Sequence, residues 1–215
     1  MKNLIFSILF LLALIALPGQ AVSDQVPFTP QAPTANWDDP RQQDACEEAS
    51  ALMAMAWVRG EDSLPAAAAE AEILKISDYT QNKYGESRDL YVADVVTQIF
   101  YDYFNYDNVC LLREATPEKL EEYLKLGHLI LAPTNGQALG NPYFTPPGPE
   151  NHMLVLKDYD PATAEFITND PGTKRGANYR YDRDLLFKAI RAYPTGFHLP
   201  HSEVVEKTVI VVKKK

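Results

Sequence analysis

The pattern of apolar residues changes character about halfway along the chain. Before residue 127, apolar residues recur at intervals of three and four, which is the period of a helix with one buried face. After residue 127, short runs of β-branched and other apolar residues alternate with turn residues, which is typical of strands. Helices followed by strands predict an α+β fold in which an N-terminal helical part packs on a C-terminal antiparallel sheet.

End signals in the first half predict four helices. The first follows an N-cap at Asp44, with Glu47 three residues later completing a box-like cap, and it stops at Gly60. Its apolar spacing indicates one face buried in the core. The other three helices are expected over residues 65–85, 90–104 and 117–127, with a short strand over residues 109–112.

The second half predicts five more strands, over residues 128–133, 152–159, 164–169, 178–182 and 208–213, with one helix over residues 182–193. A long connection over residues 134–151 contains three glycines and four prolines. Connections of this length in a compact domain are usually functional or disordered.

The N-terminus has the pattern of a secretory signal peptide. Lys2 precedes an apolar stretch over residues 4–17, Pro18 follows it, and small residues at 19 and 21 suit cleavage after Ala21. A retained membrane anchor is the alternative, although a span needs about 20 apolar residues. We expect an exported protein, either secreted, periplasmic or associated with the cell envelope, with one domain over residues 22–215.

Composition excludes several classes of function. A net charge of −9 without a basic stripe disfavours a nucleic-acid partner. The chain carries no metal-ligand motif, no phosphate-binding glycine loop and no serine-nucleophile elbow, so we expect no metal and no cofactor.

Cys46 is a candidate nucleophile because it stands at the start of the first helix. Unpaired amides and the helix dipole stabilise a thiolate there, whereas Glu47 and Glu48 raise the pKa of the thiol. Activation therefore requires a cationic partner, usually a histidine that also serves as general base. The alternative is a disulfide with Cys110, the only other cysteine, which would silence Cys46.

Of the four histidines, His152 is the best candidate for this partner, since it begins a strand directly after the long connection. A hairpin turning near Asp160 and Pro161 would place His152 opposite Asp170, whose carboxylate could orient the ring. A slip of one residue would present Asn169 instead. Acyl transfer also needs an oxyanion donor, and the residues leave this choice open among four glutamines: Gln25, Gln31, Gln42 and Gln43.

Three blocks carry a resemblance to a known family. In order, "VPFTPQAP…NW…QQDACEEAS", "NPYFTPPGPENHMLVLKDYD" and "ITNDPGTKRGANYRYD" resemble the bacterial peptidase C39-like group of the papain-like cysteine peptidase superfamily, over roughly residues 26–193. The resemblance implies a papain-like fold with Cys46 as nucleophile, His152 as base and Asp170 as the group that orients it. It suggests Gln31 for the oxyanion hole, while the position of this glutamine in papain-like enzymes keeps Gln43 as the alternative.

We therefore predict an exported thiol peptidase that hydrolyses peptide bonds of a peptide or protein substrate through a thioester. Tyr143 and Phe144, in the connection over residues 134–151, are candidates either for contacting the substrate or for filling the hydrophobic core. Glu47 departs from the pattern, since better-known relatives have glycine after the cysteine. Another thiol acyl transfer, such as amide hydrolysis in cell-wall peptides or transamidation, and an inactive peptide-binding module remain alternatives.

Overall fold

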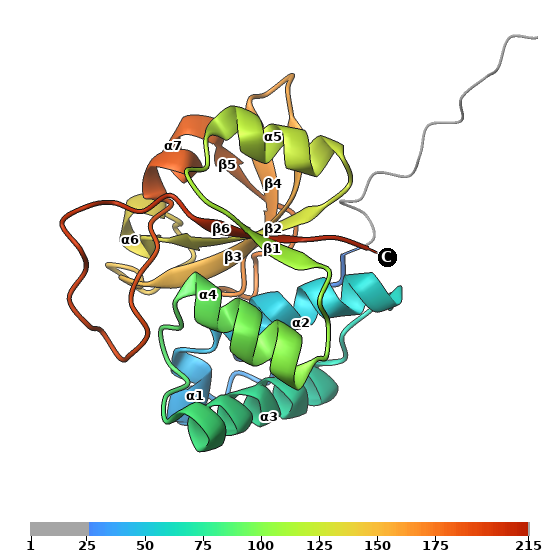
Figure 1. Ribbon diagram of the computed structural model, residues 1–215, viewed down its shortest axis with the longest axis vertical. Coiled ribbons are helices and arrows are strands. Elements are labelled where there is room, and N and C mark those ends of the chain that lie inside the picture. The colour runs from blue at the N-terminus through green and yellow to red at the C-terminus, as the bar shows by residue number, and fades with distance from the viewer. Residues whose placement is uncertain (1–25, 215) are drawn as a thin grey trace, which may run out of the picture.

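The strands form one sheet in which every pairing is antiparallel. The computed structural model describes residues 26–214, and its six-stranded sheet has the order β1-β6-β2-β3-β4-β5 (Figure 1). In chain order the strands are β1 (Val109–Leu112), β2 (Leu129–Thr134), β3 (His152–Asp160), β4 (Glu165–Asn169), β5 (Tyr179–Asp182) and β6 (Val209–Val212). Each end lies within one residue of the end expected from the sequence. The predicted signal peptide over residues 1–21 lies outside the described residues.

Helices cover both faces of this sheet. The helical elements are α1 (Pro40–Gln43), α2 (Cys46–Arg59), α3 (Ala66–Tyr84), α4 (Val92–Asp94), the π-helix η2 (Val95–Tyr103), α5 (Pro117–Lys125), α6 (Gly136–Leu139) and α7 (Arg183–Ala189). Helices α1 to α4 lie below the sheet in Figure 1, with α5 and α7 above it. The predicted α+β fold, with N-terminal helices packed on an antiparallel sheet, is confirmed.

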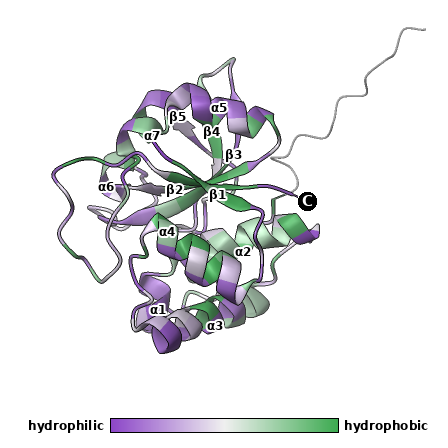
Figure 2. Ribbon diagram, in the orientation of Figure 1, coloured by the Kyte–Doolittle hydropathy of each residue, from purple (hydrophilic) through white to green (hydrophobic). Residues whose placement is uncertain are grey.

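The central strands are apolar throughout because both of their faces are covered. Every residue of β2 is buried, and alternate side chains enter two separate cores. Leu129 and Leu131 pack toward the N-terminal helices, whereas Ile130 and Ala132 pack toward α5 and α7. Figure 2 shows the hydrophobic centre of the sheet and the more polar outer helices. None of the helices within residues 26–214 combines the length and hydropathy needed to cross a membrane.

Helix α2 runs through the middle of the N-terminal layer, and all of its residues from Cys46 to Trp57 are buried. The hydroxyl of Ser50 donates to the carbonyl of Met153 at 3.2 Å, which fixes α2 against β3. The predicted cap at Asp44 is wrong. Asp44 ends α1, and Ala45 is the N-cap of α2 without a side-chain hydrogen bond, so Cys46 is the first helical residue and not the second. The local cap signal failed because a short helix occupies the preceding turn.

The β3–β4 hairpin has a different register from the expected one. Asp160 pairs with Glu165, so the loop is centred beyond Pro161, and a bulge lies between Leu156 and Asp158. Val155 therefore pairs with Asn169, and His152 does not lie directly opposite Asp170. The later turn and the bulge together displace the pairing by two residues from the expected register. A displacement of two residues returns a side chain to the same face of a sheet.

The last predicted helix is shorter than its pattern suggests. It ends at Ala189 and not at residue 193, because Ile190 forms a β-bridge with Thr134 at the end of β2. The segment after Ile190 is thereby turned toward the start of α2, where Tyr193 is buried.

Candidate active site

His152 and Asp170 form a buried pair at one end of the sheet. Nε2 of His152 lies 2.8 Å from Oδ1 of Asp170, and their side chains are 1% and 0% exposed. Asp170 is the first residue beyond β4, and Val155 pairs with Asn169, so the contact runs diagonally across the hairpin. Asn169 faces elsewhere, since its amide donates to the carbonyls of Val26 and Pro27.

Asp170 is held by three further donors. The hydroxyl of Tyr181 donates to its Oδ2 at 2.6 Å, the backbone N–H of Gly172 donates to Oδ1 at 3.0 Å, and the amide of Asn141 lies 3.3 Å from Oδ2. Burial alone would raise the pKa of Asp170. The charge of His152 and the hydrogen bonds from His152, Tyr181 and Gly172 outweigh burial and hold this pKa below its usual value. Asp170 is therefore a carboxylate in the folded protein, and it can stabilise positive charge that develops on His152 during a reaction.

The ring of His152 is fixed on its other side by packing. The ring of Phe144 meets it edge to face, with centroids 5.3 Å apart. A Cβ on Gly172 would lie 2.9 Å from Cε1 of His152 and 2.8 Å from Cε1 of Phe144, so only glycine fits there without displacing a ring. Phe144 is 8% exposed, and this position makes it a support for the histidine.

Cys46 is a free thiol placed against the backbone beside His152. Neither Cys46 nor Cys110 is in a disulfide, so the predicted alternative of a silenced cysteine is wrong. The N–H of Met153, the residue after His152, donates to Sγ of Cys46 at 3.3 Å. Since Nε2 of His152 is engaged with Asp170, Nδ1 is the ring nitrogen left to serve the thiol.

The surroundings of Cys46 oppose ionisation of its thiol. Burial raises its pKa well above the usual value, the charge of Glu47 and a hydrogen bond to Glu47 raise it further, and only the N–H of Met153 acts in the opposite direction. This agrees with the expectation that Glu47 works against the helix dipole. A resting thiol, and not a preformed thiolate, is therefore the state that this site favours.

The sequence did not predict that two residues, Glu47 and Tyr193, form a chain of hydrogen bonds with the Cys46 thiol. Glu47 is fully buried, accepts from the Cys46 thiol at 3.1 Å and accepts from the hydroxyl of Tyr193 at 2.7 Å. The sequence shows Glu47 beside the cysteine but does not show that it is buried. Tyr193 lies 146 residues away, in a segment for which the pattern predicts a helix, so no local signal indicates it.

The two candidate glutamines have different positions. Gln31 is 7% exposed, and its backbone N–H donates to the carbonyl of Pro171, next to Asp170. Its side-chain amide donates to the carbonyls of Gln42 and Gln43 at 3.0 and 2.7 Å, shortly before Cys46. Gln31 therefore lies between the Asp170 turn and the start of α2. Gln43 is exposed, and its amide donates to the carbonyl of Trp37.

Tyr143, the other candidate substrate contact, is 45% exposed. Its ring meets Tyr179 edge to face at 6.1 Å, and the guanidinium of Arg175 lies 4.8 Å from its centre. It is thus available at the surface, in contrast to Phe144.

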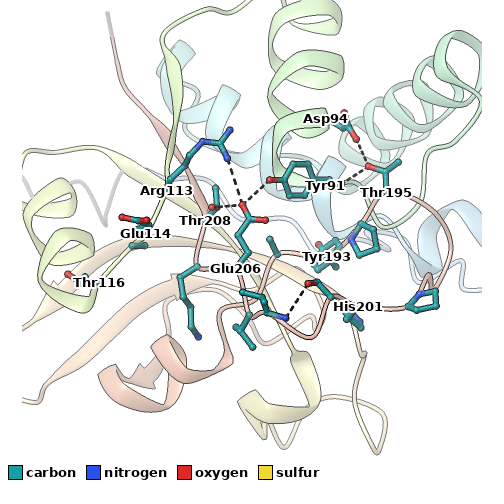
Figure 3. A pocket seen from close by; sticks show the side chains of 18 residues that line it. Tyr91, Asp94, Arg113, Glu114, Thr116, Tyr193, Thr195, His201, Glu206 and Thr208 are labelled. Atoms are coloured by element: carbon teal, nitrogen blue, oxygen red, sulfur yellow. Dashed lines mark hydrogen bonds and ion pairs between the residues drawn. The ribbon is translucent and has the colours of Figure 1, made fainter.

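A cavity of about 1230 Å³ lies near this site, but the candidate catalytic residues are not part of its lining. Figure 3 shows its lining, which comes from the start of α4, the segment over residues 113–116 after β1 and the segment over residues 192–208, and Tyr193 is among the labelled side chains. Cys46, His152 and Asp170 do not line it, whereas Tyr193 contacts both the cavity and Glu47. Within residues 26–214, no three His, Cys, Asp or Glu side chains converge as metal ligands.

Comparisons with known proteins identify the fold and the family of this chain. A solved structure of a suspected C39-like peptidase from Bacillus anthracis matches with a TM-score of 0.51 over 90% of this chain and 98% of that chain, at 16% sequence identity, which supports a shared fold. A search among curated proteins found no match. The family model of the Peptidase_C39 like family matches residues 23–194, most of the chain. The chain therefore belongs to the peptidase C39-like family.

Proposed function

We propose that this protein is a cysteine peptidase that hydrolyses peptide bonds with Cys46 as nucleophile, His152 as general base and acid, and Asp170 as the residue that orients His152. The observation that carries the proposal is the buried 2.8 Å contact between His152 and Asp170 beside a free cysteine at a helix start. The reaction follows the general logic of a nucleophile, a base and an orienting carboxylate.

In the first step, Nδ1 of His152 takes the proton of the Cys46 thiol as Sγ attacks the carbonyl carbon of the substrate. Asp170 stabilises the imidazolium that forms, because its carboxylate stays ionised at the other ring nitrogen. His152 then gives the proton to the leaving amine, which leaves a thioester on Cys46. Water, activated by His152, hydrolyses the thioester and releases the acid product.

Negative charge develops on the carbonyl oxygen during both steps. The backbone N–H of Cys46 is a donor for this charge, because the first amides of a helix have no partner within it. We assign the second donor to the side chain of Gln31, whose position between Asp170 and the start of α2 suits it better than the exposed Gln43. Its amide must then turn from the carbonyls of Gln42 and Gln43 when substrate binds.

Peptides or proteins outside the cytoplasm are the substrates we propose. Export rests on the N-terminal pattern, which predicts cleavage after Ala21. Expression of the full chain in a bacterial host tests this: the mature protein should be found outside the cytoplasm with Val22 at its N-terminus. Recovery of the uncleaved chain in the membrane fraction would favour a retained anchor.

One observation favours a second candidate, an inactive peptide-binding module. Cys46 is only 5% exposed and its thiol is hard to ionise, so the site is not poised for attack as it stands. A catalytic protein would have to admit the substrate and transfer the thiol proton in the same complex.

A peptide-library digestion distinguishes the two. The mature protein should cleave a subset of peptides, and Cys46→Ala should abolish cleavage while leaving the unfolding midpoint nearly unchanged. Cys110→Ser is the matched control, since Cys110 lies on β1 away from the site, and it should keep full activity. Binding of peptides without cleavage by the wild type would overturn the peptidase proposal in favour of the binding module.

A further inference from the structure

The thiol of Cys46 has an acceptor that the triad does not require. Its Sγ lies 3.1 Å from Oε2 of Glu47, and the other oxygen of Glu47 accepts from the Tyr193 hydroxyl at 2.7 Å. Cys46, Glu47 and Tyr193 are 5%, 0% and 2% exposed, so water does not screen this chain of contacts. Two acidic groups joined by one hydrogen bond in a buried site cannot both ionise easily.

The charged groups around Glu47 come from several elements. Glu48 follows it on α2, and burial together with the charge of Glu47 keeps the pKa of Glu48 well above its usual value. Asp89, in the segment before α4, raises the pKa of Glu47 and lies 3.6 Å from His198. On the sheet side, His152 lies one residue before the Met153 N–H that binds Sγ, and its Nε2 contacts Oδ1 of Asp170 at 2.8 Å.

The hydrogen-bond partners of the Glu47 carboxyl are the Cys46 thiol and the Tyr193 hydroxyl, and neither group carries a positive charge. Burial raises the pKa of Glu47 to about 7, although the hydrogen bonds from Tyr193 and Cys46 act to lower it. A carboxyl with such a pKa changes its charge near neutral pH while it touches the reacting sulfur.

We propose that Cys46 and Glu47 hold one proton between them in the resting protein, and that Tyr193 positions Glu47 as the acceptor. Glu47 then sets, together with His152, the pH at which Cys46 becomes a nucleophile. With the proton on sulfur, the pair is a thiol and a carboxylate; with the proton on Glu47, it is a thiolate and a carboxylic acid. During attack the S–H bond breaks, the S–C bond forms, the carbonyl oxygen takes the electron pair, and the released proton goes to His152.

This inference rests on the nucleophile assigned in the proposed function, but its test needs no substrate. In a Cys110→Ser background, thiolate formation at Cys46 is followed by ultraviolet absorbance as a function of pH. The absorbance of a variant that also carries Cys46→Ser is subtracted, because both proteins contain the same tyrosines. The rate of alkylation by iodoacetamide is measured across the same pH range. Glu47→Gln keeps the size of the side chain and removes its charge, so both profiles should move about one to two pH units lower.

Tyr193→Phe provides a second, independent variant. Loss of its hydroxyl weakens the carboxylate form of Glu47, so the shared proton spends more time on Glu47 and the thiolate appears at lower pH. The expected shift has the same direction as that of Glu47→Gln and is smaller. Glu48→Gln is the matched control, because Glu48 is an equally buried carboxyl on the same turn whose Oε2 has no hydrogen-bond partner within residues 26–214.

Circular dichroism and thermal unfolding establish that each variant is folded before its profile is compared. Coincident profiles for the parent, Glu47→Gln and Tyr193→Phe would overturn the shared proton, and so would an equal shift in Glu48→Gln. A shift specific to Glu47→Gln in a protein that cleaves no peptide would leave this inference standing and remove the proposed function. Peptide cleavage by a protein whose profiles do not shift in Glu47→Gln would leave the proposed function standing and remove this inference.

Discussion

His152 and Asp170 touch across a hairpin in which they are not paired residues. Val155 pairs with Asn169, so Asp170 lies past the last pair of β4, yet its Oδ1 is 2.8 Å from Nε2 of His152. Side chains two positions apart along paired strands share a face, and long ones reach each other diagonally. The contact therefore depends on the turn that follows β4 as much as on the sheet.

Replacing Asp170 with asparagine should separate its charge from its shape. Asp170→Asn keeps the size of the side chain but presents an amide to His152, which removes the stabilisation of the imidazolium and disturbs the ring tautomer. We expect kcat/KM for a cleaved peptide to fall by about 10²- to 10⁴-fold. The measurement is steady-state hydrolysis, with Asn169→Asp as a control at the neighbouring position, whose amide binds the N-terminal segment. Unchanged hydrolysis in Asp170→Asn would contradict the role of the carboxylate.

Tyr181→Phe should change both stability and its dependence on pH. The Tyr181 hydroxyl donates to Asp170 at 2.6 Å, so its loss leaves a buried carboxylate short of a donor and costs about 1–3 kcal/mol of unfolding free energy. The pKa of Asp170 is below its usual value in the folded protein, so its stabilisation is present at neutral pH and is lost as pH falls through the folded pKa.

In Tyr181→Phe this folded pKa moves upward, and the acid loss of stability should begin at higher pH. Urea unfolding between pH 3 and pH 7 measures both effects. Tyr179→Phe is the control, because Tyr179 is on the same strand but its hydroxyl does not donate to Asp170. If the unfolding free energies of Tyr181→Phe and the wild type decrease over the same pH range, the hydroxyl does not stabilise the charge of Asp170.

The fold followed from the sequence because it depends on local periodicity. Strand ends came within one residue, since alternation and turn residues are local signals. The β3–β4 register was wrong because a bulge between Leu156 and Asp158 leaves no local signature. His152 and Asp170 still met because the total error was two residues, which preserves the face.

The environment of Cys46 shows where local reasoning ends. The position of Cys46 at a helix start follows from the sequence, but the burial of Glu47 and its contact with Tyr193 come from long-range packing. A charged pair "EE" at the first turn of a helix normally indicates an exposed, dipole-stabilised turn. Here the N-terminal segment, the sheet and the segment after α7 enclose that turn, and only the assembled structure reveals it.

Gly172→Ala should damage activity through the rings that it contacts. The new Cβ would lie under 3.0 Å from both His152 and Phe144, and the ring of His152 must turn to relieve the overlap. We expect at least a tenfold fall in kcat/KM. Gly136→Ala is a steric control, because its Cβ would overlap Pro149 to a similar degree and no ring of the site. Equal losses of activity at equal losses of stability in the two variants would mean that the effect is general destabilisation.

Gln31→Ala and Gln43→Ala together test the oxyanion assignment. If Gln31 donates to the developing charge, its loss should lower kcat by about 10²- to 10³-fold with little change in KM. Gln43→Ala should stay within threefold of wild type, since its amide is exposed and bound to Trp37. The opposite ranking in steady-state kinetics would transfer the role to Gln43. Because Gln31 also binds two carbonyls before α2, unfolding of both variants by urea accounts for any change in stability.

Glu48→Gln should stabilise the protein at high pH. Glu48 is buried, its Oε2 has no hydrogen-bond partner within residues 26–214, and its pKa is raised well above the usual value. A carboxyl that is neutral when folded but ionised when unfolded reduces stability as pH rises above its unfolded pKa of about 4.3, by up to about 1.4 kcal/mol per pH unit. Glutamine cannot ionise, so the unfolding free energy of Glu48→Gln relative to the wild type should be smallest near pH 4 and should increase toward pH 8. Urea unfolding at the two values measures the difference, and a constant difference between the proteins would mean that Glu48 is ionised in the folded state.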